Sequence, residues 1–528
     1  MTKHSVTFSF SATGLGALLL LSLVPLACTN LDETPSSALT PGNFYRNEAE
    51  VLAGLAGVYS QLRNTTWGYY NLGEITSDEM IVPTRGQDWY DNGRWLELHR
   101  QQWSASSPTG LEDINGAWSD AYTGIARANA LLDAMQKVSV PNQARIIAET
   151  RTLRAYFYYQ LMDLFGGVPI VTSNDYKPHA RSTRAELFAF IATELKAARP
   201  DLPAQWDDAN RGRVTKGAAA AILANMYINA AVFTKDVGIA VSYNSCATVT
   251  LGSGTACDSA SAYADSLLNS PQYALEDSFP KAFRYNNHLS KENIFVVRSL
   301  ASDGLGLNFV MRALHYNQFT PAPWNGFAAT ADAYNAFSAA DARRGIFLIG
   351  QQYDMNSGTP GVPVNNRQGT PLIFTDSIGD ATAAHEDEGP RILKWPPDPK
   401  HVGPDNGNDF AYFRLGEIYL IKAEALLESG NAPGAKTWID NLRARDFNPA
   451  QPVGAVTRDT IFRERLLELA GESKRRQDLI RFGLYTAARA IDDIPAHNLV
   501  ARDATRVLMP IPQTQMDANP LLKQNAGY

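Results

Sequence analysis

The sequence predicts a mainly α-helical protein: an α/α superhelix of degenerate tetratricopeptide-type helix pairs that carries an irregular, loop-rich subdomain. Three observations lead to this fold class. Apolar residues recur at helical spacing in several consecutive segments, one segment near the C-terminus fits the tetratricopeptide pattern, and helical periodicity fades between residues 271 and 408. The expected boundaries are 1–27 for a signal peptide, 28–40 for a tether, 41–270 for an N-terminal helical region, 271–408 for the loop-rich subdomain and 409–528 for a C-terminal helical region.

The composition is that of an ordered globular chain. The 528 residues are 45% hydrophobic and 19% charged, which excludes wholesale disorder. Lys and Arg number 47 against 54 Asp and Glu, so the formal net charge is -7. Because a protein that holds a phosphate backbone needs a surplus of basic residues, nucleic acid is not an expected partner.

The N-terminus carries an apolar run that ends at a cysteine. The run passes through Gly14–Leu21 and ends at Cys28. It is too short to span a bilayer and has the length of a secretory signal. A cysteine in this place, followed by a polar stretch, is typical of a lipoprotein in which fatty acids such as palmitate anchor the chain permanently to a membrane. Pro25 and Leu26 depart from the usual residues before such a cysteine, so the alternatives are plain cleavage or an uncleaved anchor.

Amphipathic helices account for most of residues 41–270. Each is recognised by an apolar face, by a capping residue before it or by a Gly or Pro after it. The expected helices are Glu48–Leu62 with Asn47 as its cap, Trp118–Leu132, Arg154–Leu164 ending before Gly166, Arg184–Ala198 ending before Pro200, and a small-residue helix after the cap Thr215.

One helix pair near the C-terminus matches the tetratricopeptide unit. Its small, large, glycine, alanine, apolar and proline positions are occupied by Ala423, Leu426, Gly430, Ala435, Ile439, Leu442 and Pro449. The stretch Gly430–Thr437 also approaches a phosphate-binding loop, but Ala435 stands where that loop requires its second glycine. We therefore interpret it as the turn between two repeat helices.

Two stretches are irregular. Between residues 271 and 408 Gly, Pro, Asn and Asp are frequent, and Asn293–Val297 reads as a short strand. Residues 64–108 have a similar composition. Long loops on a rigid scaffold are where binding residues usually lie, so we look for a ligand site there.

The two cysteines after Cys28 predict a disulfide. Cys246 and Cys257 enclose a polar, glycine-rich stretch, and an exported protein folds in an oxidising compartment. The alternative is a pair of inert thiols. Metal is not expected, because two cysteines without a nearby histidine pair do not complete a tetrahedral site.

Catalytic motifs are not found. The sequence has no Gly-x-Ser-x-Gly elbow and no His-Glu-x-x-His pair, and no catalytic residue or cofactor is predicted. The acidic stretches His385–Glu388 and Asp405–Asp409 lack the spacing of a calcium loop, and we interpret them as solvated loops, with calcium as the alternative. A carboxylate pair for glycoside hydrolysis would not be visible in sequence, so a secreted glycan hydrolase stays a minor alternative.

Tryptophans are concentrated in one irregular stretch. Trp67, Trp89, Trp95 and Trp103 are four of the chain's 9 tryptophans. Flat aromatic faces suit the apolar faces of sugar rings, and polar neighbours can hydrogen-bond the hydroxyls. The alternative is that the rings pack the loop onto the helices. If both loop regions lie on one side of the scaffold, the candidate ligand-binding residues are Trp67, Trp89, Tyr90, Trp95, Tyr316 and Trp324, and the candidate polar neighbours are Asn71, Arg85, Asp88, Asp91, Asn92 and Arg94.

The chain resembles the SusD/RagB family of nutrient-uptake lipoproteins. The resemblance is carried by short motifs in family order along nearly the whole mature chain. They are Leu31–Pro35, Leu39–Pro41, Asn43–Tyr45, Leu153–Tyr156, Phe165–Pro169, Lys291–Phe295, Arg414–Leu420 with Ala423–Ala425, Glu464–Ala470, Arg475–Gly483, Pro510–Pro512, Asn519–Pro520 and Gln524–Tyr528.

The resemblance implies a surface-exposed, lipid-anchored protein of the outer membrane. Such a protein covers a SusC-like TonB-dependent transporter and captures a nutrient, usually an oligosaccharide, for import; a peptide-binding version is the nearest alternative. Family members are generally not enzymes. Their shared motifs are mainly scaffold, and ion pairing on the predicted helices accounts for Glu464, Glu468 and Arg475. The motifs do not include the ligand site, so the candidate site depends on the aromatic residues alone.

Overall fold

The computed structural model describes residues 44–174, 177–488 and 501–528. Residues Tyr45–Tyr528 form one unit. The predicted signal peptide, the tether and Cys28 lie outside the described residues. Within the described residues, no helix is both long and apolar enough to cross a membrane.

The N-terminal half is a succession of helices that begin where local signals predict. Asn47 accepts a hydrogen bond from the amide of Glu50 (3.0 Å) and caps the first described helix, while Thr183 and Thr215 cap two later ones. The expected helices are confirmed, one of them with identical bounds at 184–198. The helices are α2 (Glu48–Asn64), α3 (Gly68–Glu74), α4 (Arg94–His99), α5 (Asn115–Ala134), α6 (Gln143–Phe165), α7 (Arg184–Ala198), α8 (Lys216–Ile228), α9 (Ala230–Phe233) and α10 (Ala256–Leu268).

The C-terminal part adds a helix pair of the expected kind. In helix α13 (Leu415–Glu428) and helix α14 (Ala432–Arg443), the predicted tetratricopeptide positions Ala423, Ala435, Ile439 and Leu442 are buried. Gly430 lies in the turn between them with φ +82°, as the repeat interpretation requires. The chain continues through α15 (Arg458–Leu469), α16 (Arg475–Arg481) and α17 (Gln513–Ala518).

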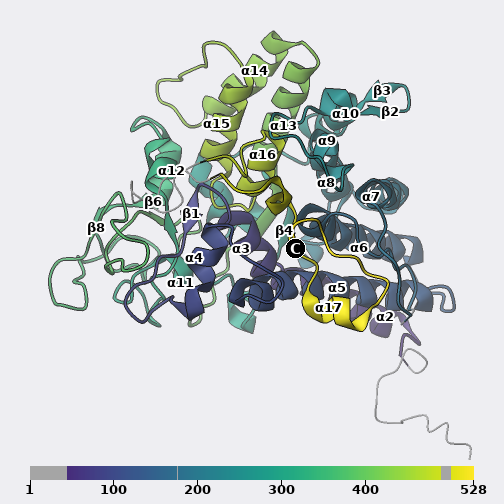
Figure 1. The fold of residues 1–528 in the computed structure, drawn as a ribbon, viewed down its shortest axis with the longest axis horizontal. Coiled ribbons are helices and arrows are strands. Elements are labelled where there is room, and N and C mark those ends of the chain that lie inside the picture. The colour runs from purple at the N-terminus through teal and green to yellow at the C-terminus, as the bar shows by residue number, and fades with distance from the viewer. Residues whose placement is uncertain (1–43, 175–176, 489–500) are drawn as a thin grey trace, which may run out of the picture. The chain divides into compact units, whose positions relative to one another are not determined.

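Neighbouring helices pack side by side through the scaffold. Helix α6 packs between α5 and α7, α10 between α8 and α13, and α13 against α14 (Figure 1). The small-residue helix α8 is buried on every side, because its alanines let neighbouring backbones approach closely. These contacts enclose one continuous apolar core that runs from α2 to the C-terminal helices.

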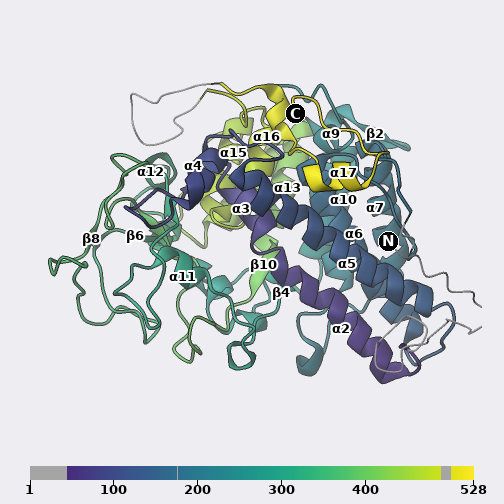
Figure 2. The ribbon, with the colours of Figure 1, turned by 60° about the horizontal axis from the view of Figure 1, so that its bottom comes forward.

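Among the described residues, short helices and pairs of short strands occur in the loop-rich subdomain and in a few places outside it. Helices α11 (Phe309–Ala313) and α12 (Ala331–Asn335) lie among its loops. The antiparallel strand pairs are β1 (Met80–Ile81) with β5 (Ala328–Ala329), β2 (Thr250–Leu251) with β3 (Gly254–Thr255), β4 (Asn293–Val297) with β10 (Phe410–Arg414), β6 (Phe347–Leu348) with β9 (Arg391–Ile392), and β7 (Gly350–Gln351) with β8 (Ile373–Phe374). In the pair β4–β10, Val297 stands opposite Phe410. The two strands lie side by side near the centre of the view in Figure 2.

The described residues also contain single helical turns. They are the 3₁₀ turns η2 (Asp91–Gly93), η4 (Arg199–Asp201), η5 (Asp208–Asn210), η6 (Cys246–Thr248), η7 (Phe279–Phe283), η8 (Asn287–Leu289), η9 (Ala301–Asp303), η10 (Ala342–Ile346) and η12 (Ala504–Val507), and the π turn η3 (Gly110–Ile114).

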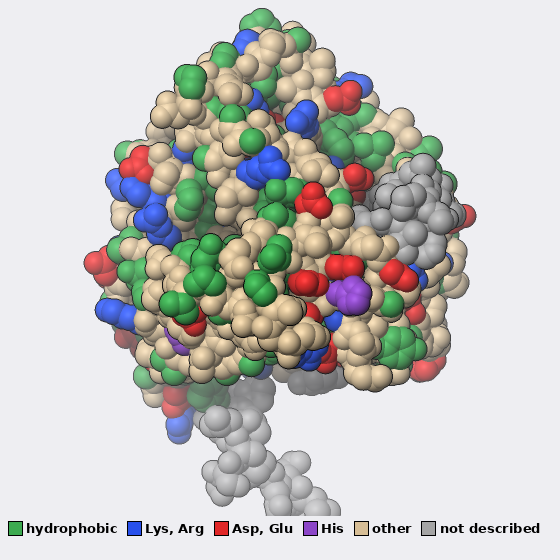
Figure 3. All heavy atoms as spheres, turned by 90° about the vertical axis from the view of Figure 1, so that its left-hand side faces the viewer, with side chains coloured by type: hydrophobic (Ala, Val, Ile, Leu, Met, Phe, Trp, Pro, Cys, Tyr) green, Lys and Arg blue, Asp and Glu red, His purple; other side chains and the backbone are tan. Residues whose placement is uncertain are grey.

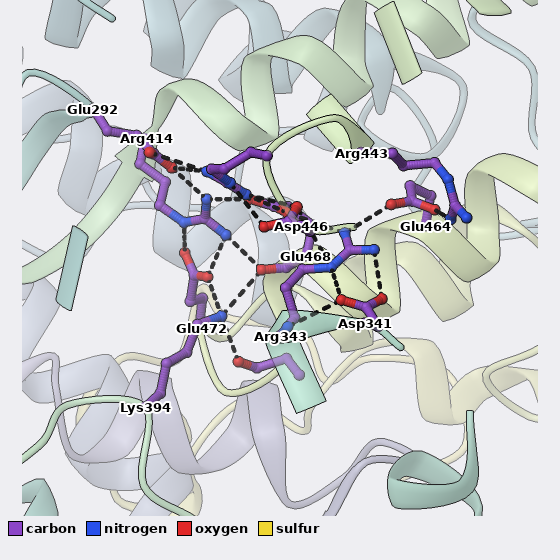
Figure 4. Close-up of polar contacts among 12 residues, drawn as sticks. Glu292, Asp341, Arg343, Lys394, Arg414, Arg443, Asp446, Glu464, Glu468 and Glu472 are labelled. Atoms are coloured by element: carbon purple, nitrogen blue, oxygen red, sulfur yellow. Dashed lines mark hydrogen bonds and ion pairs between the residues drawn. The ribbon is translucent and has the colours of Figure 1, made fainter. Parts of the chain in front are cut away.

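A buried network of ion pairs joins the loop-rich subdomain to the C-terminal helices. Glu468 of α15 is fully buried and contacts Arg343, Arg414 and Arg445 (Figure 4). Glu464 pairs with Arg343 at 2.7 Å. Ion pairing, the expected role of Glu464, Glu468 and Arg475, is therefore confirmed. The pairs are buried or partly buried, and several connect residues far apart in the chain.

A disulfide joins Cys246 and Cys257, whose Cα atoms are 5.0 Å apart. The strands β2 and β3 form a small hairpin between the two cysteines, and Cys257 lies in the first turn of α10. The bridge therefore ties this hairpin to the helical scaffold.

Candidate functional site

Two loop segments distant in sequence meet at one aromatic cluster. The segment 64–108 supplies Trp67, Trp89 and Trp95, and the loop after α11 supplies Trp324 and Phe327. Strand β1 of the first segment pairs with β5, directly after Phe327, with Ile81 opposite Ala328. This pairing fixes the two segments side by side.

Trp89 lies at the centre of the cluster. Its ring centroid is 5.3 Å from that of Trp95, 5.7 Å from that of Phe327 and 6.5 Å from that of Trp324. Its indole Nε1 donates a hydrogen bond to the carbonyl oxygen of Trp324 (2.6 Å). Trp67 extends the row, with its ring 6.5 Å from Trp95. These edge-to-face and tilted contacts hold the rings in fixed orientations.

The backbone beneath the rings adopts conformations that few residues favour. Trp89 has φ +63° and Asn325 has φ +50°, both in the left-handed region. Gly326 lets the indole of Trp89 approach closely, because a Cβ at this position would stand 2.4 Å from the ring. Such strain persists only where surrounding contacts hold it, and it is common at binding sites.

The rings differ in what they offer to a ligand. Trp67, Trp89, Tyr316 and Trp324 are half-buried, and Tyr90 is 56% exposed. Trp95 is only 1% exposed, so it supports the cluster from within instead of presenting a face to a ligand.

Trp103 lies apart from the cluster. It is fully buried, and its Nε1 donates to the hydroxyl of Tyr528 at the C-terminus (2.8 Å). The concentration of tryptophans in the sequence therefore combines two roles: packing for Trp95 and Trp103, and partly exposed aromatic surface for the rest.

Polar side chains adjoin the aromatic surface. The hydroxyl of Tyr316 donates to Asp88 Oδ2 (2.5 Å), and burial together with this bond raises the pKa of Tyr316 to about 12. The guanidinium of Arg367 lies 4.2 Å over the Tyr316 ring and donates to Glu386 (2.6 Å). Arg367 is 50% exposed in its side chain, so this row of polar groups reaches solvent.

Sequence reasoning missed Arg367 and misjudged two acidic stretches. Glu386 and Asp409 are not solvated: they are 7% and 1% exposed and pair with Arg367 and Arg298. Burial lowers the pKa of the nearby His315 to about 4, so the ring is neutral at pH 7 although Glu386 is 3.5 Å away. No local signal in the sequence distinguishes these carboxylates from exposed ones.

Several predicted polar neighbours serve the scaffold instead. Asn71 and Arg94 both bond to buried Asp113, and Arg85 donates to backbone carbonyls of 385 and 388. Of the predicted polar neighbours, Asp88, Asp91 and Asn92 keep exposed surface.

A buried guanidinium lies beneath the cluster. The Cζ atom of Arg312 is 4.5 Å from the ring centroid of Trp67 and 4.3 Å from that of Phe309. Burial lowers the pKa of Arg312 to about 10, which still leaves it charged at neutral pH. The cation is stabilised by the ring faces and by the carbonyl of Thr66, and it fixes Trp67 from below.

The face of the molecule on which β6, β8 and α12 lie is chemically mixed. Figure 3 shows apolar, acidic and basic side chains interspersed over this side.

Within the described part of the chain, no group of three His, Cys, Asp or Glu side chains is placed to hold a metal ion. The groups that the aromatic cluster and its neighbours offer to a ligand are therefore rings, a hydroxyl, carboxylates and a guanidinium group.

Two family models match the chain. The model described as "SusD family" matches residues 291–528, and the one described as "Starch-binding associating with outer membrane" matches residues 31–228.

Individual proteins agree with these matches. The starch-binding protein SusD of Bacteroides thetaiotaomicron is 28% identical over 87% of this chain and 85% of its own length, and a SusD-like protein of Bacteroides ovatus is 23% identical over 88% and 81%. The structure is similar to that of surface glycan-binding protein A from Bacteroides thetaiotaomicron in complex with laminarihexaose, with a TM-score of 0.67, 21% identity and coverage of 91% of this chain and 99% of that chain.

The fold, the order of its motifs and these matches agree over both halves of the molecule. The chain belongs to the SusD/RagB family.

Proposed function

We propose that this protein is a surface-exposed outer membrane lipoprotein that binds an oligosaccharide and passes it to a SusC-like TonB-dependent transporter. The observation that carries the proposal is the convergence of Trp67, Trp89 and Trp324 with Tyr316 at one partly exposed surface. Rings in fixed orientations can stack against sugar faces, while Asp88 and Arg367 offer an acceptor and donors for hydroxyls.

The relatives support a role in binding carbohydrate rather than in catalysis. One is named for binding starch, and a similar structure holds laminarihexaose. One matching family model is described as associating with the outer membrane. A shallow aromatic surface desolvates few hydroxyls, so its affinity is expected to be modest, which suits a protein that must release its cargo.

Calorimetry with single variants tests the binding site. We expect Trp89→Ala and Trp324→Ala each to weaken binding of maltohexaose or laminarihexaose by about 1–3 kcal/mol, the range for losing a large contact at a binding hot spot. Trp438→Ala is the matched control, because Trp438 is a half-buried tryptophan on α14 that packs against Tyr419.

The binding results distinguish a glycan-binding protein from a peptide-binding protein and from a hydrolase. Well-folded variants that all bind like the wild type would overturn the aromatic site. Binding to a peptide panel but to no glycan would replace the oligosaccharide by a peptide, and release of shorter sugars by the purified protein would indicate a hydrolase.

Membrane attachment is tested at Cys28. Without the acylated cysteine, only weak interfacial attachment of the leader is left, so Cys28→Ala should release the protein from membranes and abolish incorporation of labelled fatty acid. Equal fatty-acid labelling and equal membrane retention of the variant would contradict lipid anchoring at Cys28.

Co-purification of a TonB-dependent transporter with the wild-type protein from detergent-solubilised outer membranes tests the proposed transporter partner.

A further inference from the structure

Two aspartates lie at the edge of the aromatic cluster and bring negative charge to it. Asp88 and Asp91 enclose Trp89 and Tyr90 in the chain. The side chain of Asp88 is 41% exposed, and Asp91 is exposed in the turn η2. A ligand that stacks on the ring of Trp89 therefore comes close to both carboxylates.

Each aspartate uses one oxygen within the protein and keeps the other for a ligand. Asp88 Oδ2 accepts a hydrogen bond from the Tyr316 hydroxyl (2.5 Å), and Asp91 Oδ2 accepts one from Trp95 Nε1 (2.6 Å). No described residue donates a hydrogen bond to Oδ1 of either aspartate. Asp88 Oδ1 is not enclosed, because the unpartnered buried atoms of the described residues do not include it. Both side chains can thus accept a hydrogen bond from outside.

The exposed cation beside these groups is already paired with carboxylates. Arg367 Nε lies 2.6 Å from Glu386 Oε2, and Arg367 Nη1 lies 3.5 Å from Asp88 Oδ2. Arg94 and Arg312 also contact rings of the cluster, but they are only 8% and 3% exposed. Among the described residues that contact these rings, no exposed guanidinium group is therefore free of a carboxylate.

A sugar hydroxyl and an acidic group on a sugar differ in two ways at such carboxylate oxygens. A hydroxyl can donate a hydrogen bond to them, whereas a carboxylate or sulfate group offers only acceptors. An acidic group also carries the same charge as the aspartates, so the two repel each other. Binding surfaces gain selectivity through such repulsive elements as well as through attractive contacts.

We propose that Asp88 and Asp91 make the aromatic cluster selective for oligosaccharides without acidic groups, so that it rejects glycans that carry carboxylate or sulfate groups. This inference rests on the proposed function and specifies the class of oligosaccharide. The sugar ring stacks on Trp89 or Trp324 while its hydroxyls donate to Oδ1 of the two aspartates. An acidic group in place of such a hydroxyl removes the donor and adds repulsion.

Matched pairs of ligands test this selectivity. Hexaoses of glucose, mannose and galactose are compared by calorimetry with the same hexaoses after oxidation of their C6 hydroxyls to carboxylates. In about 20 mM salt, the oxidised form of a hexaose that binds should have an affinity about tenfold or more below that of the neutral form. The difference should shrink in about 500 mM salt, because salt screens the repulsion between exposed charges.

A double variant tests the two aspartates directly. Asp88→Asn with Asp91→Asn keeps the shape of both side chains and removes their charges. The affinity for the oxidised hexaose divided by that for the neutral hexaose should rise severalfold. A general loss of binding cancels in this ratio, because both ligands are measured on the same protein. The matched control is Asp201→Asn, at an exposed aspartate of η4 on the helical scaffold, which should leave the ratio unchanged.

The proposal is overturned if the oxidised hexaose binds as tightly as the neutral one, or if neither salt nor the double variant reduces the difference. This failure is distinguishable from failure of the proposed function. If an oxidised hexaose binds more tightly than its neutral form and Trp89→Ala abolishes that binding, the aromatic cluster binds glycan but the selectivity is wrong. If no hexaose of either form binds, the proposed glycan site itself fails.

Discussion

Replacing Glu468 by glutamine tests whether the buried ion network holds the scaffold together. The Glu468 carboxylate is fully buried and accepts hydrogen bonds from Arg343 Nη1 (3.1 Å), Arg414 Nη1 (2.5 Å) and Arg445 Nη2 (2.7 Å to Oε1). Glutamine keeps the shape of the side chain but removes its negative charge. It also turns an amide N–H donor toward guanidinium N–H donors, which cannot accept its hydrogen bond. Breaking a buried ion pair by removing one partner typically costs about 3–5 kcal/mol.

The contacts that remain in Glu468→Gln place its expected loss of unfolding free energy at the lower end of this range of about 3–5 kcal/mol. Arg343 keeps Asp341 (2.8 Å), and Arg414 keeps Glu472 (2.7 Å), so neither guanidinium is left without a carboxylate. Removing Glu468 also relieves repulsion of Asp446, whose pKa is raised to about 6 by burial and then by the Glu468 charge. We therefore expect a loss of about 3 kcal/mol in the free energy of unfolding.

The assay is urea denaturation of the purified protein at pH 5 and pH 7.5. Because the pKa of Asp446 is raised on folding, its contribution to stability is present at low pH and is lost as the pH rises through about 6. In Glu468→Gln the pKa of Asp446 is lower, because the repelling charge is gone. The loss in the free energy of unfolding relative to wild type should therefore be larger at pH 5 than at pH 7.5.

Glu112→Gln is the control for this experiment. Glu112 is 63% exposed and pairs with Arg94 at 3.2 Å, so its loss should cost less than about 1 kcal/mol. If Glu468→Gln costs no more than this surface change, the network does not stabilise the fold as argued.

Three further predictions concern stability and the aromatic site. Burial and a neighbouring buried carboxylate raise the pKa of Glu74, so its stabilising contribution is present below about pH 4.5 and is lost at higher pH. Glu74→Gln imitates the protonated form, so the variant should lose less stability between pH 5 and pH 8 than the wild type does. A steeper fall of the variant's urea midpoint over this range would contradict the prediction. Cys246→Ser should cost about 2–3 kcal/mol by opening the disulfide, measured by calorimetry, and two free thiols in the unreduced wild-type protein would remove the basis of this expectation. Gly326→Ala places a methyl group 2.4 Å from the Trp89 ring and should weaken glycan binding about tenfold. The control variant Gly345→Ala places its methyl group in open space and should bind glycan normally. Equal affinities of the two variants in calorimetry would show that binding does not need Gly326.

Local signals in the sequence predicted individual elements well. Helix α7 has the predicted bounds 184–198, because the Thr183 capping box and the proline after its end act within a few residues. Strand β4 also coincides with the predicted Asn293–Val297. These features depend on neighbours in the chain, so one sequence is enough to find them.

Long-range contacts could not be predicted in the same way. Glu468 meets Arg343, 125 residues away, whereas sequence reasoning considers partners three or four positions along a helix. The contact between Trp89 and Trp324 depends on the β1–β5 pairing, of which two-residue strands give no signal. The composition indicated that aromatic residues matter, but only the fold separates Trp95, which is buried, from its partly exposed neighbours.

The pairing of β4 with β10 has a consequence for how such a protein can be altered. Val297 and Phe410 stand opposite each other, so the long excursion between them leaves and rejoins the helical scaffold at one point. A segment with adjacent ends can be exchanged for another of different length at a small cost in loop-closure entropy, provided that the new segment supplies a partner for Glu468. Chimeras joined at this strand pair would exchange the half of the aromatic surface that carries Trp324, Tyr316 and Arg367, and would keep Trp67 and Trp89 of the old scaffold.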